Sequence, residues 1–333
     1  MNKSKISYGQ FSAILLTSDA FALICYSQKI SIITILSFLI SMVIQVAVVY
    51  PVIKSDKSHD KKWILLLYLI VSILWGALLF VRVWHISDAI YIPLPKLKFD
   101  TQKLIISALI AIVCLYASSP GIKALSRASV ITAGFGILCI IIVALGSIKS
   151  NNIENLYIAD QNGIASQITY GLSLSGSICI FPYLSGQLKD SKTKSATIYF
   201  ICRAVLFTGI IILTLLTTGG IMKITDFPII KAVELCQPFN TQRTDALFIL
   251  VLVLLATVAI SSQIVISSQI IESIFPKFRR FKSSAIISVT LIVAVILGKT
   301  NIYNILYAII FLLPAVAFTV FHLKNSVKGG KSK

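Results

Sequence analysis

Long apolar runs separated by short polar stretches make up most of the sequence, and 57% of its residues are hydrophobic. A helix needs about 20 mainly apolar residues to cross a bilayer. On that basis we expect ten spans, near residues 7–26, 30–53, 63–86, 102–119, 125–147, 164–186, 197–219, 246–271, 284–298 and 302–322. The pattern therefore predicts an all-α integral membrane protein in which residues 1–333 form a single transmembrane domain.

The sixth run, residues 164–186, contains no charged residue, but its middle is poorly suited to a continuous helix. Small and polar residues gather there and a proline follows them: Tyr170, Gly171, Ser173, Ser175, Gly176, Ser177 and Pro182. Backbone groups freed at membrane depth are tolerated only against protein or a water-filled cavity. Two interpretations stay open, a broken helix that holds a small ligand and a face of small residues on which another helix packs.

Asp19 lies near the middle of the first run, beside Thr17 and Ser18. A carboxylate at that depth costs about 2.5–3.5 kcal/mol on insertion scales, so such residues commonly mark functional sites. We expect Asp19 to bind a ligand ammonium group, a sodium ion or a proton, unless it lies near the outer interface or caps a half-helix at Ala20. Trp75 in the third run is deep enough to form a wall of the same pocket.

Ser261 and Ser262 in the eighth run place two hydroxyl groups on the cytoplasmic half of that span. Together with Asp19 they are candidate ligands of a hard cation, because such ions prefer oxygen. Hydroxyls in membrane helices more often bond their own backbone or a neighbouring helix. The sequence leaves both interpretations open.

Polar interruptions in the first and sixth runs suggest a LeuT-like five-plus-five inverted repeat with breaks in helices 1 and 6. Repeat one would cover about residues 7–147 and repeat two about 164–298, with 302–322 as the last span closing repeat two. Lysine and arginine gather in the loops on one side and in the basic tail, residues 323–333. This asymmetry predicts that both termini lie in the cytoplasm.

The formal net charge of +18 comes largely from these short loops, which argues against nucleic-acid binding. The six cysteines form no CxxC pair and have no histidine at metal-ligand spacing, so they predict neither disulfides nor a metal site. No glycine-rich phosphate loop and no catalytic histidine constellation is present in the sequence. We therefore expect a protein that is not an enzyme and needs no cofactor.

Several short motifs lie within and between the runs. Phe227-Pro228 precedes a short apolar and charged stretch, and a run from Arg243 through Asp245 to Phe248 opens the eighth span. Further motifs are Ile6-Ser7 with Gln10, Gly121 to Arg127, and Phe181-Pro182-Tyr183-Leu184. Together these motifs resemble the B subunit of Ger-type spore germinant receptors. Two departures are Phe21, where the family usually has glycine, and the short connection from Tyr26 to Ile30.

The resemblance implies a fold of the amino acid/polyamine/organocation transporter superfamily, in the inner membrane of endospores. Such a B subunit works beside an A subunit and a lipoprotein C subunit, and is thought to hold a germinant, often an amino acid, between spans one and six. Three hypotheses follow for this chain. It is a nutrient-binding receptor subunit, a proton- or sodium-coupled amino-acid transporter, or a divergent structural subunit without a ligand.

Overall fold

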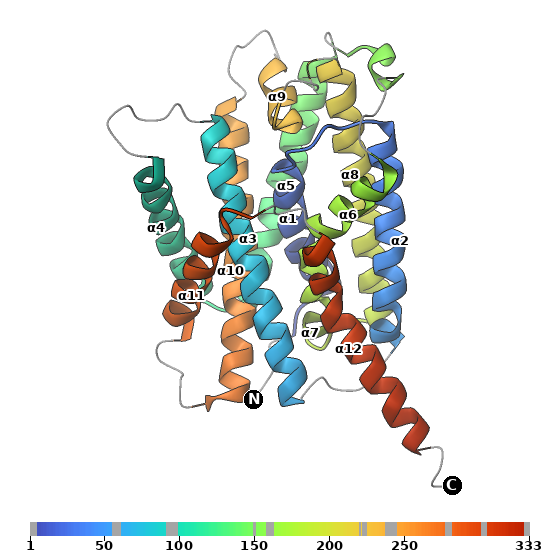
Figure 1. Cartoon of the computed structure of the whole chain (residues 1–333), viewed down its shortest axis with the longest axis vertical. Coiled ribbons are helices and arrows are strands. Elements are labelled where there is room, and N and C mark those ends of the chain that lie inside the picture. The colour runs from blue at the N-terminus through green and yellow to red at the C-terminus, as the bar shows by residue number, and fades with distance from the viewer. Residues whose placement is uncertain are drawn as a thin grey trace.

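The computed structural model describes residues 5–54, 61–90, 99–148, 151–157, 163–219, 221, 225–236, 245–276, 282–300 and 305–329. Its helices pack into one elongated bundle, in which α1 begins and α12 ends at the same end (Figure 1). The long helices are α2 (Ile32–Lys54), α3 (Lys62–Ile90), α4 (Phe99–Ser118), α5 (Ile122–Ser147), α8 (Lys192–Thr218), α10 (Asp245–Ile274) and α12 (Ile305–Gly329). The shorter ones are α1 (Tyr8–Ile24), η1 (Ile153–Tyr157), α6 (Ile164–Leu174), η2 (Gly176–Cys179), α7 (Phe181–Ser185), α9 (Pro228–Leu235) and α11 (Lys282–Leu297).

The all-α membrane architecture predicted from the apolar runs is confirmed. Within the described residues, five helices are long and apolar enough to cross a bilayer: Ile32–Lys54, Lys62–Ser87, Ile122–Ser147, Lys192–Thr218 and Ala246–Ile274. Four further apolar helices, Tyr8–Ile24, Ile105–Ser118, Lys282–Leu297 and Ile305–Phe321, are shorter. The remaining expected span is the interrupted segment α6–η2–α7. The ten-span arrangement with a five-plus-five repeat therefore stays a prediction.

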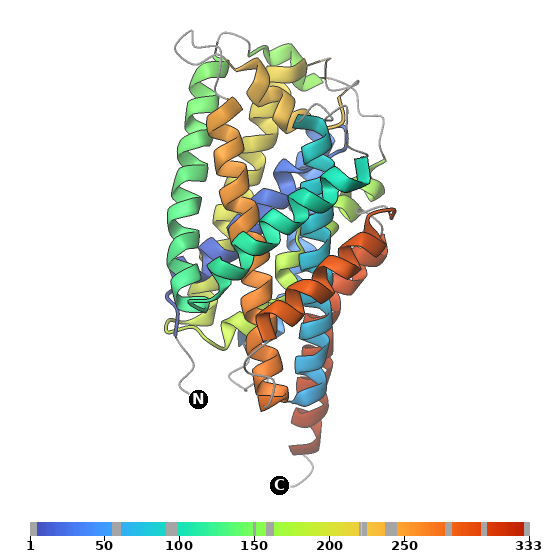
Figure 2. The same ribbon diagram turned by 90° about the vertical axis from the view of Figure 1, so that its left-hand side faces the viewer.

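Burial separates the centre of the bundle from its outer helices. In α3 and α10, 67% and 72% of the most apolar 18-residue window is buried, against 22% in α5. α10 packs against α3, α5, α1 and α4, and α1 also packs against α5 and α8. Figure 2 shows α4 and α11 running obliquely across this packed centre. Since lipid is as apolar as a protein core, the exposed leucine, isoleucine and valine side chains of α5 and α8 are those expected of bilayer-facing helices.

The predicted break in the first span is not present in the structure. α1 runs from Tyr8 to Ile24 without interruption. The hydroxyl of Thr17 donates to the backbone oxygens of Ala13 and Ile14, at 2.9 and 3.0 Å, so this polar residue is satisfied inside a continuous helix. Phe21 is fully buried, and no glycine or proline lies between Gln10 and Ile24 to interrupt the helix.

The predicted interruption of the sixth span is confirmed. α6 ends at Leu174, and Ser175 leaves the helical conformation with φ −105° and ψ 42°. One turn of 3-10 helix, η2, follows. The short helix α7 then begins at Phe181, with Pro182 in its first turn, where the missing N–H costs nothing. The serine-rich stretch is therefore a helix break placed inside the bundle.

A capping box fixes the beginning of α1 and accounts for one of the sequence motifs. The backbone N–H of Ser7 donates to Oε1 of Gln10 at 3.1 Å, and the N–H of Gln10 donates to Oγ of Ser7 at 3.5 Å. Ile6 joins the chain that follows α7 through two backbone bonds, Ile6 N to Gln187 O and Lys189 N to Ile6 O, each 3.0 Å. The start of α1 is thereby attached to the segment between α7 and α8.

We expect Ser7→Ala to lower the free energy of unfolding by about 1 kcal/mol, because the cap hydroxyl is lost. Thermal unfolding of the purified protein in nanodiscs measures this change. Ser166→Ala is the control, since that exposed hydroxyl only bonds the carbonyl of Gly163. An equal loss in both variants would contradict the importance of the cap.

Candidate functional site: a buried charged cluster at the helix break

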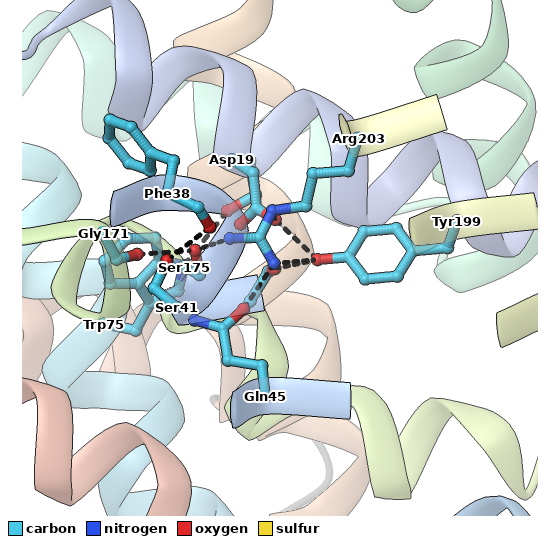
Figure 3. Close-up of polar contacts among 11 residues, drawn as sticks. Asp19, Phe38, Ser41, Gln45, Trp75, Gly171, Ser175, Tyr199 and Arg203 are labelled. Atoms are coloured by element: carbon cyan, nitrogen blue, oxygen red, sulfur yellow. Dashed lines mark hydrogen bonds and ion pairs between the residues drawn. The ribbon is translucent and has the colours of Figure 1, made fainter. Parts of the chain in front are cut away.

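Asp19 of α1 and Arg203 of α8 form an ion pair in the middle of the bundle. Arg203 Nε lies 3.3 Å from Asp19 Oδ2, with both side chains at most 2% exposed. The hydroxyl of Tyr199, one helical turn before Arg203, donates to the same carboxylate oxygen at 2.6 Å. Because residues i and i+4 share one helix face, α8 presents Tyr199 and Arg203 side by side to Asp19. Figure 3 shows the guanidinium group at the centre of these contacts.

The rest of the guanidinium group is held by α2 and by the helix break. Nη1 of Arg203 donates to Gln45 Oε1 at 2.5 Å, and Nη2 donates to the hydroxyl of Ser175. Ser177, also in the break, lies 3.3 Å from the Tyr199 hydroxyl. We call these six residues, Asp19, Gln45, Ser175, Ser177, Tyr199 and Arg203, the charged cluster. Three helices and the break thus converge on a single buried charge pair.

Three buried polar atoms of the charged cluster have no hydrogen-bond partner: Oδ1 of Asp19, an acceptor, Nε2 of Gln45, a donor, and Nε of Arg203, which has only its ion pair with Asp19. A buried polar group without a partner costs about 1–3 kcal/mol, so such atoms call for an explanation. Here an acceptor and a donor remain open beside one ion pair.

Aromatic and glycine residues form the walls next to the charged cluster. Trp75 Nε1 donates to the hydroxyl of Ser18 at 3.0 Å, and the Arg82 guanidinium lies 4.8 Å from the Trp75 ring centre. A Cβ atom at Gly176 would overlap the Trp75 ring, and one at Gly171 would lie 2.5 Å from Ser41 Oγ. Both glycines therefore allow a close approach that no larger residue permits.

The other predicted site residues are placed nearby but are less directly involved. The hydroxyl of Ser173 bonds the carbonyl of Tyr170 at 2.9 Å, and the ring of Tyr170 packs edge-on against Tyr26 at 6.5 Å. Thr17 bonds its own helix, as described above. Five of the predicted residues lie in one contiguous group in the structure: Ser18, Asp19, Trp75, Ser175 and Ser177. Whether that group binds a ligand stays a prediction.

The candidate ion site at Ser261 and Ser262 has a different geometry. Ser261 donates to the carbonyl of Cys114 in α4 at 3.4 Å, and Ser262 donates to that of Ala259 at 2.7 Å. Both hydroxyls thus serve as donors to backbone oxygens. Their role as cation ligands stays a prediction, and among the described residues no three histidine, cysteine or acidic side chains form a metal-binding group.

Sequence reasoning missed Arg203, Tyr199 and Gln45. A signal was present, because an arginine inside an apolar run requires a partner at membrane depth, and Asp19 was the obvious candidate. The i, i+4 spacing of Tyr199 and Arg203 places both on the same face. Gln45 gave no comparable signal, since an isolated amide in a span is common on packing faces.

The motif residues have structural roles where they are described. Gly121, with φ 82°, is the N-cap of α5, so the glycine of the Gly121 to Arg127 motif is required by a left-handed backbone. Arg127 is exposed near the start of α5, while Pro182 and Pro228 are buried at the beginnings of α7 and α9. Asp245 is the first residue of α10, and Arg243 lies outside the described residues.

Comparison with known proteins identifies the family. The model of a family described as spore germination protein, Spore_permease, matches residues 96–303. The chain therefore belongs to this family, which confirms the resemblance seen in the sequence motifs. A search of curated proteins found no match to the chain.

Proposed function

We propose that this spore germination protein is the membrane subunit of a germinant receptor, and that the charged cluster binds a small nutrient near the membrane midplane. The observation that carries the proposal is the fully buried Asp19–Arg203 pair at a helix break, with an open acceptor and an open donor beside it. Intramembrane ionisable residues and broken helices are both characteristic of small-molecule sites in membrane proteins.

An amino acid is the nutrient class that this chemistry favours. Its ammonium group would donate to Asp19 Oδ1, and its carboxylate would accept from Arg203 and from Nε2 of Gln45. A zwitterion inserted between the two side chains gives each buried charge a new partner, so that no charge is left alone. The further predicted ligand residues, Thr17, Ser18, Trp75, Tyr170, Gly171, Ser173, Gly176 and Ser177, would border the bound molecule.

Signalling would follow from the convergence of α1, α2, α8 and the break on one ligand. A nutrient shifts the balance between two arrangements of these elements only as far as it binds one of them more tightly. The shift would be sensed by A and C subunits at the inner spore membrane, with both termini of this chain on the cytoplasmic side.

A coupled transporter is the second candidate function. It is favoured by the buried Asp19 carboxylate, whose open oxygen could carry a proton or, with Ser261 and Ser262, a sodium ion. Uptake of an amino acid into proteoliposomes by this chain alone, abolished by Asp19→Asn, would support transport over reception. A structural subunit without a ligand would show neither binding nor uptake.

We expect one or more amino acids to raise the unfolding temperature of the protein in nanodiscs. A ligand at 100 times its dissociation constant stabilises the folded state by about 2.7 kcal/mol. The double variant Asp19→Asn with Arg203→Gln removes both charges while keeping a polar side chain at each position, and should lose the shift.

The matched control is Glu234→Gln, which removes an exposed carboxylate of α9 that pairs with Lys231 at 2.8 Å. This variant should retain the full shift. A shift that persists unchanged in the double variant would place the nutrient elsewhere. The absence of a shift for every amino acid with the folded protein and its partner subunits would leave the structural-subunit hypothesis.

A further inference from the structure

A cavity of about 340 Å³ lies between α1, α5, α8, α9 and α10. Its wall is almost entirely aliphatic and aromatic, with Leu16, Ile140, Leu206, Val233 and Phe248 among its members. Its two threonines offer no open hydroxyl proton: Thr17 bonds its own helix, and Thr214 donates to the carbonyl of Ile210 at 2.8 Å. An apolar cavity of this kind does not hold water, and its lining suits neither a nutrient zwitterion nor an ion.

The cavity is closed on one side and open on the other. Leu16 and Thr17 of α1 form its buried back wall, at 9% and 1% exposure. Ile137 of α5 and Ile201 and Val205 of α8 also line it, yet they are 46%, 58% and 67% exposed. These three side chains belong to the apolar outer faces of α5 and α8. The cavity is therefore continuous with the hydrocarbon that surrounds those faces.

We propose that this cavity binds one acyl chain of a membrane phospholipid, which enters between α5 and α8. Its volume lies within the range of about 300–1,000 Å³ typical of small-molecule sites. Transfer from lipid to protein brings no hydrophobic gain, so the driving force is van der Waals contact with a wall that otherwise has no partner atoms. A flexible hydrocarbon chain is the occupant that supplies such contacts and carries no polar group into the cavity.

The cavity is separate from the charged cluster but shares its supporting helices. Ala20 and Cys202 line the cavity, and they are the immediate chain neighbours of Asp19 and Arg203. A bound acyl chain would fill the space behind the two helices that hold the ion pair. The bound lipid chain would thereby help to hold α1 in place against α8.

Two glycines of α5 provide a matched test. A Cβ atom at Gly134 or at Gly136 would meet no atom within 4 Å, so both accept a larger side chain. Gly136 lines the cavity, whereas Gly134 is exposed and does not. Gly136→Leu therefore fills the cavity entrance, and Gly134→Leu makes the same chemical change on the outside of the same helix.

The experiment uses the full chain in nanodiscs containing phosphatidylcholine with a photoactivatable diazirine on one acyl chain. After illumination, mass spectrometry locates the labelled residues. We expect labelling of cavity residues, such as Cys139 and Cys202, in the wild type. Gly136→Leu should reduce it by about tenfold, because the leucine side chain blocks the entrance that the acyl chain would use, and Gly134→Leu should leave it unchanged. Ala133→Leu, at a second lining position, repeats the test if Gly136→Leu does not fold.

Two results would overturn the proposal. Labelling confined to residues that face outward and do not line the cavity, such as Ile131 and Leu138, would show lipid around the bundle only. Equal labelling of the cavity residues in wild type, Gly136→Leu and Gly134→Leu would show that the diazirine reaches them without an acyl chain seated in the cavity.

Discussion

Arg203→Gln is expected to lower the free energy of unfolding by about 3–5 kcal/mol, because the variant leaves the Asp19 carboxylate buried without its counter-ion. The loss should be visible as a lower unfolding temperature in nanodiscs and as reduced accumulation in the membrane. Few single substitutions in the charged cluster should cost more. The reason is that Arg203 is joined at once to α1, α2 and the helix break.

The informative comparison is the double variant Asp19→Asn with Arg203→Gln. Removing both charges eliminates the uncompensated one, so the double variant should recover more than half of the stability lost by Arg203→Gln. Arg127→Gln on the exposed start of α5 is the control and should change stability by less than about 0.5 kcal/mol. Additive losses in the double variant would refute a direct ion pair between Asp19 and Arg203.

Gly176→Ala is expected to be the most damaging addition of a single methyl group among the described glycines of the helices. The new Cβ would overlap the ring of Trp75. That ring has little room to move, because it is fully buried, bonds Ser18 and packs edge-on against Phe311 at 5.0 Å. Overpacking of this kind costs about 1–3 kcal/mol and occasionally more. Thermal unfolding of the variant measures the loss.

Gly209→Ala in α8 is the matched control, since a Cβ there meets nothing within 4 Å. It should be neutral or slightly stabilising, because alanine favours a helix over glycine by about 1 kcal/mol. Adding Trp75→Leu to Gly176→Ala should recover part of the lost stability by making room for the methyl group. If Gly176→Ala is as stable as Gly209→Ala, the close contact between the break and α3 is absent.

The sequence predicted a structural element correctly where a local residue pattern is compatible with only one structure. Apolar runs predicted membrane helices because lipid excludes unpaired backbone groups, and the glycine and serine residues of 170–177 predicted the break at Ser175. The first span was harder, because a carboxylate that follows two hydroxyl residues looks similar in a broken helix and in a continuous one. Thr17 bonds its own backbone there, and α1 remains intact.

The charged cluster could be predicted only in part. Asp19 was identified from its cost in a membrane, but the residue that neutralises it lies 184 positions further along the chain. The need of each charge for a partner could be read from its place in an apolar run, but the pairing itself depends on how α1 and α8 pack, which no local pattern encodes. Gln45 and the cavity behind α1 depend still more on packing, because their importance arises from what surrounds them and not from their own sequence context.

The backbone bonds between Ile6 and the chain at 187–189 bear on how this molecule can move. Tyr8 N also donates to the carboxylate of Asp190 at 2.9 Å, so the first turn of α1 is fastened to the approach to α8 at three points. Because of these bonds, α1 cannot tilt at this end without moving the start of α8 in the same direction. The relative motion has to be taken up elsewhere, and the turn residues Ser175 and Ile180 on either side of η2 are the joints nearest the ion pair.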